Sequence, residues 1–188
     1  MKKSIIITGI IVVILIILIA VTGSSYNGMV SKQEEVENKF SAIDTQLQRR
    51  ADLIPNLVST VKGYASQEKE VIESVANARA KLAGANTVSE KAQADGELTS
   101  ALNRLMIVVE SYPELKSSQN FVQLTDELAG TENRIATARR DYNEAVKVYN
   151  LKIKKFPTNI MAGMFGFEEA EYFEASEKSQ EVPNVSFE

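Results

Sequence analysis

The sequence contains no cysteine, no histidine and no tryptophan. Without cysteine it can form neither disulfide bonds nor thiolate metal sites. Without histidine or cysteine, and without a recognised nucleotide or metal motif, it also lacks the side chains that most enzymes use. We therefore predict a protein that is not an enzyme and that has no cofactor or metal site.

Excess positive charge is also missing. The 21 lysines and arginines are outnumbered by 25 aspartates and glutamates, giving a net charge of −4. No basic patch interleaved with aromatic residues occurs, and such a patch is what nucleic-acid binding requires. The composition therefore excludes nucleic acid as an expected partner.

What the chain does have is a long apolar run near its beginning. A helix over residues 4–25 would be about 33 Å long, enough to cross a hydrocarbon core of about 30 Å. Residues 1–25 are therefore predicted to be a transmembrane anchor, with the lipid bilayer as partner. Apolar positions spaced along this anchor are Ile5, Ile10, Ile14, Leu18 and Val21.

A cleaved secretory signal is the alternative, because Lys2 and Lys3 also resemble a signal n-region. Signal apolar regions are usually shorter, however, and Ala20-Val21-Thr22 is a poor cleavage site. An uncleaved anchor is the favoured interpretation.

The charges that flank the run predict its orientation. Lys2 and Lys3 precede it, whereas Lys32 and Lys39 follow it among several glutamates. Because positively charged flanks stay in the cytoplasm, we expect a single-pass protein of the bacterial inner (cytoplasmic) membrane with its body outside the cytoplasm.

The rest of the chain has helical periodicity as far as Pro157. From Val36 to Tyr64, apolar residues recur in alternating steps of four and three, and Thr87 with Glu90 forms a capping box. Helices are expected over residues 26–65, 67–84, 88–112 and 118–155. Short connections make successive helices antiparallel. The predicted fold is all-α: an N-terminal transmembrane helix followed by a long antiparallel up-down four-helix bundle over residues 26–156.

Several motifs together resemble the LemA family. They include residues 49–58 (RRADLIPNLV), residues 131–139 (TENRIATAR), residues 156–159 (FPTN) and residues 164–167 (MFGF). The resemblance implies a bacterial inner-membrane protein with an antiparallel helical bundle and no assigned catalytic residues. Relatives in this family are linked to membrane-organelle formation, and genes of the family often lie beside that of a membrane-bound heat-shock metalloprotease. By analogy, the resemblance implies a role in membrane scaffolding or in quality control.

Arg50 occupies a position in the apolar seam between Leu47 and Ile54. A buried guanidinium needs a partner. We expect a buried polar cluster that fixes helix register rather than one that binds a ligand; its members are Arg50, Glu127, Glu132 and Arg139.

Pro55 is expected inside the first bundle helix, where a proline leaves the carbonyl of Ala51 without its helical hydrogen bond. It should bend the helix around the core. A hinge that transmits strain is the alternative interpretation.

Two Tyr-Asn pairs, Tyr142-Asn143 and Tyr149-Asn150, lie one heptad apart. The tyrosines should pack inward with their hydroxyls hydrogen-bonded. For the asparagines, a solvated surface and inter-subunit hydrogen bonding both remain open.

Residues 157–188 form a C-terminal segment, expected to be partly packed near the membrane-proximal end of the bundle and partly disordered. Because the last long helix returns toward the membrane, it should deliver a group of apolar side chains there. A plug at the base of the bundle is favoured over an interfacial segment. This membrane-proximal tail comprises Phe156, Met164, Phe165, Phe167, Tyr172 and Phe173.

The expected function is that of a non-enzymatic structural or assembly component of the bacterial cell envelope, acting as a scaffold by homo-oligomerisation of its coiled-coil-like helices. The alternative is an envelope stress sensor or adaptor that binds a membrane protease, its substrates or another envelope protein.

Overall fold

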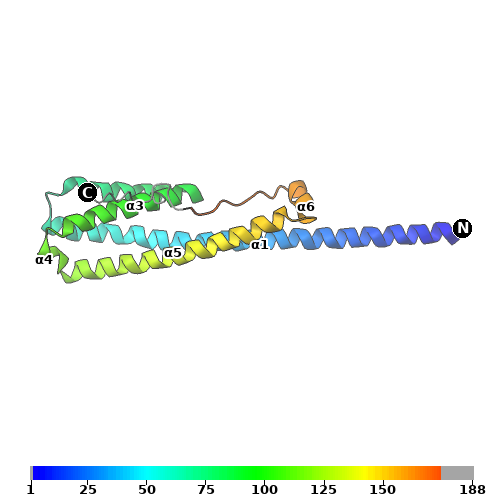
Figure 1. Cartoon of the computed structure of the whole chain (residues 1–188), viewed down its shortest axis with the longest axis horizontal. Coiled ribbons are helices and arrows are strands. Elements are labelled where there is room, and N and C mark those ends of the chain that lie inside the picture. Colours follow the sequence, from blue (N-terminus) through cyan, green and yellow to red (C-terminus); the bar gives the residue numbers. More distant parts are fainter. Residues whose placement is uncertain (1, 175–188) are drawn as a thin grey trace, which may run out of the picture. The chain divides into compact units, whose positions relative to one another are not determined.

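The computed structural model describes residues 2–174 of the chain, with side chains from residue 6 onward. Residues 175–188, which belong to the C-terminal segment predicted to be partly disordered, and the side chain of Ile5 lie outside the described residues. Within them there are helices and no strand, so the predicted all-α fold class is confirmed (Figure 1). The helices are α1 (Lys2–Tyr64), α2 (Lys69–Gly84), α3 (Val88–Val109), α4 (Pro113–Lys116), α5 (Gln119–Lys154) and α6 (Thr158–Phe165).

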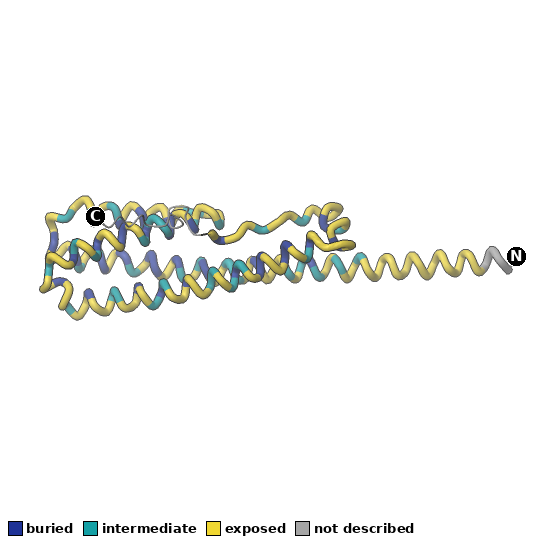
Figure 2. The backbone as a smooth tube through the Cα atoms, in the orientation of Figure 1, coloured by how far each residue is buried: buried dark blue, intermediate teal, exposed yellow. Residues whose placement is uncertain are grey.

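Helix α1 runs without interruption from the apolar stretch into the bundle. The Thr22-Gly23-Ser24-Ser25 junction, which from sequence could have broken it, is helical, and the Thr22 hydroxyl donates to the carbonyl of Leu18 at 2.8 Å. The apolar stretch is exposed along its described length (Figure 2). One helix therefore supplies both the predicted anchor and the first helix of the bundle.

The chain divides into two compact units. Unit 1 comprises Met1–Lys39 and Glu144–Ala170, and unit 2 comprises Phe40–Asn143 and Glu171–Glu188. Both α1 and α5 contribute a part to each unit, and every contact described below lies within one unit.

Unit 2 contains α2, α3 and α4 together with the C-terminal part of α1 and the N-terminal part of α5. Apolar residues from all of these elements are buried in it, since each helix turns its periodic apolar stripe inward. Representative core side chains are Ile43, Leu57, Val75, Leu98, Leu105, Leu115 and Ile135. The predicted capping box is confirmed: Thr87 accepts from the backbone N–H of Glu90, whose carboxylate accepts from that of Thr87.

Unit 1 contains the N-terminal part of α1, the C-terminal part of α5 and α6. Its core is small and includes Met29, Val146 and Ala162. After α5 a cis Phe156–Pro157 bond leads into α6, which ends at Phe165 and is followed by Gly166 as its C-cap. Gly166 adopts a left-handed conformation with φ of 74°, which glycine tolerates best.

Two boundaries between the bundle helices differ from expectation by more than one residue. The second helix begins at Lys69 instead of 67, and Glu68 at its N-cap makes no capping hydrogen bond through its side chain. The helix predicted to end at residue 112 ends at Val109, and Pro113 then opens the short α4. Proline fits the first turn of a helix because its missing N–H has no partner to lose there.

Candidate functional site

The predicted anchor presents its apolar side chains outward. Ile10, Ile14, Leu18 and Val21 are each about half exposed, and no residue of the most apolar window of α1 is buried by the rest of the chain (Figure 2). A contiguous apolar surface of this length is unusual on a soluble protein and is long enough to cross a membrane.

A buried ion cluster joins three helices of unit 2. One guanidinium nitrogen of Arg50 on α1 lies 2.6 Å from a carboxylate oxygen of Asp95 on α3 and 2.7 Å from one of Glu132 on α5. The second carboxylate oxygen of Asp95 pairs with Arg139 of α5. Arg50 is 4% exposed and Asp95 is 1% exposed. Asp95 therefore bridges two arginines in the core.

Burial and mutual charge set the electrostatics of this cluster. Burial lowers the pKa of Arg50, and the negative charge of Glu132 opposes that effect. Burial and the positive charge of Arg50 lower the pKa of Arg139. Both guanidinium groups remain charged because an arginine side chain does not lose its proton in proteins. Two cations thus face two carboxylates, which neutralises the cluster.

The Nε atoms of Arg50 and Arg139 are buried without a hydrogen-bond acceptor among the described residues. Such unpaired donors are costly. A buried ion cluster of this kind is better suited to fixing the register of the helices than to maximising the free energy of unfolding. The burial of Arg50 and its ion pairs are as expected, and its role in fixing the helix register stays a prediction.

The membership of the cluster differs from the sequence prediction in two residues. Glu127 does not belong to it: its carboxylate pairs with Arg49 at 2.8 Å, and both side chains are about half exposed. Asp95 is central to it but was not predicted. Its signal was present in the sequence, since Asp95 precedes Leu98 and Leu102 by three and seven residues and so shares their inward face.

Pro55 lies inside α1, as expected, and its side chain is exposed. The carbonyl of Ala51, which loses its helical partner to the proline, accepts a hydrogen bond of 2.8 Å from Nε of Arg79 on α2. The helix therefore tolerates the proline because a neighbouring helix satisfies the released acceptor.

In unit 1 the segment after α6 is held by the second Tyr-Asn pair. The Tyr149 hydroxyl donates to the carbonyl of Glu168 at 2.9 Å. The Asn150 amide donates to the carbonyl of Ala170 and accepts from its N–H, both at 2.9 Å. Asn150 is 6% exposed, so it is a buried amide that binds the backbone of an extended segment.

In unit 2 the first pair makes the same contacts. Tyr142 donates to the carbonyl of Glu171 at 2.8 Å, and the Asn143 amide both donates to and accepts from the backbone of Phe173. Burial, with a smaller contribution from the charge of Glu171, raises the pKa of Tyr142 to about 12. The phenol is therefore a neutral donor throughout the physiological range.

The Phe173 ring is buried and lies 4.8 Å from the guanidinium carbon of Arg139. This contradicts its assignment to the membrane-proximal tail: Phe173 packs beside the ion cluster of unit 2. Tyr172 is exposed.

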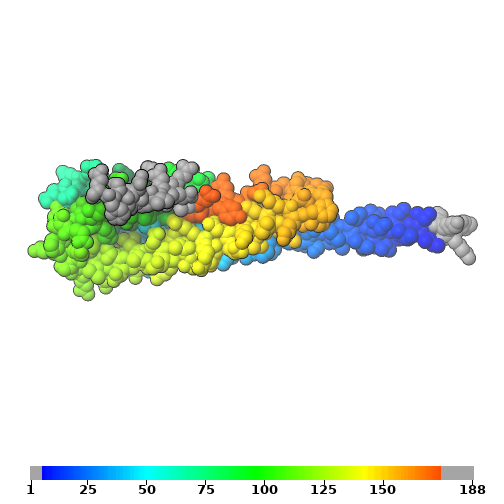
Figure 3. All heavy atoms as spheres, in the orientation of Figure 1, coloured from blue at the N-terminus to red at the C-terminus, as the bar shows by residue number. Residues whose placement is uncertain are grey.

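The other predicted tail residues lie in unit 1, in and around α6, which is on the molecular surface (Figure 3). Phe165 and Phe167 pack edge-on against Tyr26 of α1, with ring centroids 5.0 and 5.7 Å away. Phe156 and Met164 are exposed. Sequence reasoning favoured a plug, but the buried residues of α6 are the small Thr158 and Ala162.

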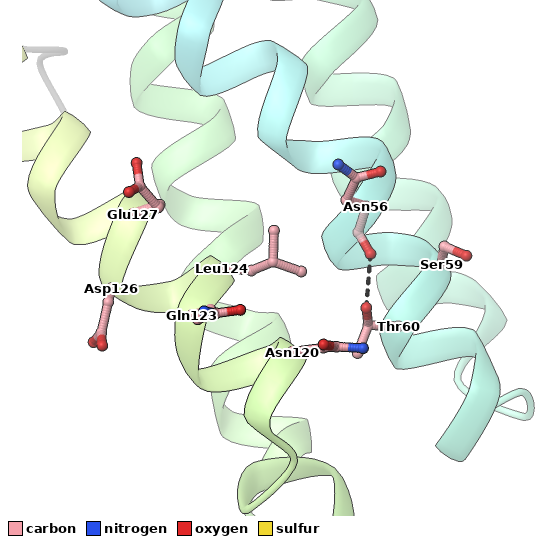
Figure 4. A pocket seen from close by; sticks show the side chains of 8 residues that line it. All are labelled: Asn56, Ser59, Thr60, Asn120, Gln123, Leu124, Asp126 and Glu127. Atoms are coloured by element: carbon pink, nitrogen blue, oxygen red, sulfur yellow. Dashed lines mark hydrogen bonds between the residues drawn. The ribbon is translucent and has the colours of Figure 1, made fainter.

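Unit 2 also has an open groove of about 650 Å³ between α1 and α5 (Figure 4). Polar side chains dominate its lining, and the Thr60 hydroxyl already donates to the carbonyl of Asn56. The groove is lined by Asn56, Ser59 and Thr60 of α1 and by Asn120, Gln123, Leu124, Asp126 and Glu127 of α5. Among the described residues, no group of acidic side chains is placed to hold a metal ion.

The motifs quoted for the family resemblance thus include residues of the ion cluster and of α6. A profile of the LemA family matches residues 39–187, which is well over half of the chain. This chain belongs to the LemA family. The resemblance seen in the sequence is confirmed, and family membership together with the apolar helix indicates a membrane-associated helical protein.

Among the relatives of this LemA-family chain is magnetosome protein MamQ 2 of Paramagnetospirillum magneticum, 34% identical over 176 residues. Magnetosome protein MamQ of Magnetospirillum gryphiswaldense is 29% identical over 174 residues. Both alignments cover 79% of this chain, which spans 64% of the length of those relatives. Protein LemA of Metamycoplasma hominis is 27% identical over 152 residues, covering 80% of this chain and 69% of that protein.

Proposed function

We propose that this protein is anchored in the bacterial inner membrane by the N-terminal part of α1 and acts as a non-enzymatic structural or assembly component of the cell envelope. The observation that carries the proposal is α1 itself. An exposed apolar stretch long enough to span a bilayer continues, without a break, into the first helix of a bundle. A lipid environment would cover the apolar stretch and leave the bundle in water.

We further propose that copies associate side by side through α5. Val148 and Leu151 are exposed and lie one turn apart on this helix, in unit 1. Exposed apolar residues at helical spacing are what lateral association of helices uses. Similarity to magnetosome proteins supports a membrane-associated role of this kind.

The mass of detergent-extracted protein tests the association. A homogeneous multiple of the 20.7 kDa chain is expected. Replacing both Val148 and Leu151 with glutamate should reduce it to the monomer, because opposed carboxylates would have to be desolvated. Ile107→Glu, at an exposed position of α3, is the control and should leave the mass unchanged. A wild-type monomer that co-purifies with another envelope protein would favour the sensor or adaptor role instead.

The charges before the anchor lead us to propose that the bundle lies outside the cytoplasm. Protease added to intact spheroplasts should then digest residues beyond the anchor. A cytoplasmic protein serves as the control for integrity and should survive. Complete protection of the bundle until the cells are lysed would reverse the orientation.

A further inference from the structure

We infer that α6 forms a second membrane contact, in which its exposed apolar edge rests in the boundary between lipid headgroups and acyl chains. The apolar edge is defined as Phe156, Ile160 and Met164. The inference rests on the proposed anchoring of α1, but adds an interaction surface to it.

The apolar edge faces away from unit 1. Phe156 is 80% exposed, Ile160 51% and Met164 70%. Ile160 and Met164 are four residues apart and so share one face of α6, roughly opposite the buried Thr158 and Ala162. Ile160 and Met164 thus point outward while the smaller Thr158 and Ala162 pack inward, the reverse of the pattern for a helix that closes a core.

The rings next to this edge place α6 at the end of the anchor. Phe165 and Phe167 contact Tyr26, the residue that directly follows the Ser24-Ser25 pair at the end of the predicted anchor. A hydrocarbon core of about 30 Å takes up about 20 helical residues, so a span that starts near Ile5 ends close to Tyr26. Tyrosine is enriched at the headgroup level. All these contacts lie within unit 1, so α6 is at that level too.

The charges around the apolar edge fit an interfacial position. Lys155 precedes Phe156, is exposed and makes no ion pair among residues 6–174. The neighbouring Lys154 is neutralised by Glu169 at 2.6 Å. A long lysine side chain beside buried apolar residues can keep its ammonium in the headgroup region. With Lys155 as the cation adjacent to the apolar edge, the contact depends on apolar burial more than on anionic lipid.

The occupant that these observations favour is therefore the bilayer that α1 spans. A second protein copy could cover the same edge, but continuity with the anchor holds the edge next to lipid in every copy. Covering by protein is kept as an outcome of the test.

A single tryptophan provides the test, because the sequence contains none. Phe156→Trp and Met164→Trp are made separately in the full chain, which is reconstituted in phosphatidylcholine vesicles. Emission should shift to shorter wavelength and be quenched by acyl chains brominated near the headgroup more than by chains brominated near their ends. Ile107→Trp, exposed on α3, is the matched control and should be quenched by aqueous iodide instead.

Ile14→Trp in the anchor separates failure of this inference from failure of the anchoring. If deep bromines quench it while Phe156→Trp and Met164→Trp are quenched by iodide as strongly as Ile107→Trp, the anchor stands and the second contact is wrong. Tryptophans at 156 and 164 sheltered from both bromine and iodide would mean that protein covers the edge, which also overturns the inference. If bromines fail to quench Ile14→Trp, the anchoring itself is wrong.

Discussion

Replacing Asp95 with alanine is expected to lower the free energy of unfolding of the bundle by about 3 to 5 kcal/mol, because it leaves two buried arginines without their shared carboxylate. Arg50→Ala should also cost several kcal/mol, since Asp95 is almost fully buried. Arg50→Met should be milder because methionine replaces the lost packing. Denaturant unfolding of the full chain in detergent, followed by circular dichroism, measures these differences.

Asp126→Ala is the matched control. Asp126 is an exposed aspartate in the same unit and, within the described residues, is not part of an ion pair. It should change the free energy of unfolding by less than about 0.5 kcal/mol. An Asp95→Ala protein as stable as the Asp126→Ala protein would show that the ion cluster does not hold the three helices together.

Replacing Asn150 with alanine is expected to release the segment after α6 from α5. The substitution leaves the N–H and the carbonyl of Ala170 without partners, at about 1 to 3 kcal/mol for each group that stays buried. We therefore expect the segment to detach from α5, so that water hydrogen-bonds to the N–H and the carbonyl of Ala170. Hydrogen exchange at the Ala170 amide should accelerate, and protease should cut residues 167–174 faster.

The control for this change is Asn159→Ala, an exposed asparagine on α6. It removes an amide of the same size without removing a hydrogen bond to residues 167–174. Equal exchange rates at Ala170 in the two variants would mean that the Asn150 amide is not what retains the segment.

Local patterns predicted the helices well. The alternating steps of three and four along α1, and the Thr87 capping box, are signals confined to one helix, and each helix displays them whatever its neighbours are. The inward position of Arg50 followed from the same periodicity. The short connections between the expected helices then predicted an antiparallel bundle, and the family resemblance implied the same architecture.

The contacts between residues far apart in the sequence were harder to predict. Glu127 and Glu132 both flank the inner face of α5, and only the structure shows that Glu132 reaches Arg50 while Glu127 reaches Arg49. The partners of Asn143 and Asn150 are backbone groups, which have no residue identity to recognise in a sequence. In α6 the large Ile160 and Met164 are exposed and the smaller Thr158 and Ala162 are buried. Which face of α6 is buried depends on how each face fits the helices around it, and the sequence of α6 alone does not reveal that.

The two Tyr-Asn pairs limit which length changes the chain tolerates. Seven helical residues rise about 10.5 Å, and three extended residues span about 10 Å. Tyr149 comes seven residues after Tyr142 in the sequence. Its acceptor Glu168 comes three residues before Glu171, which is the acceptor of Tyr142, so the two segments run antiparallel. One residue inserted between Ala170 and Glu171 would have to bulge out of the segment, or one of the two sets of hydrogen bonds would be lost. A heptad added to α5 between the pairs would need three added residues in the segment that they bind.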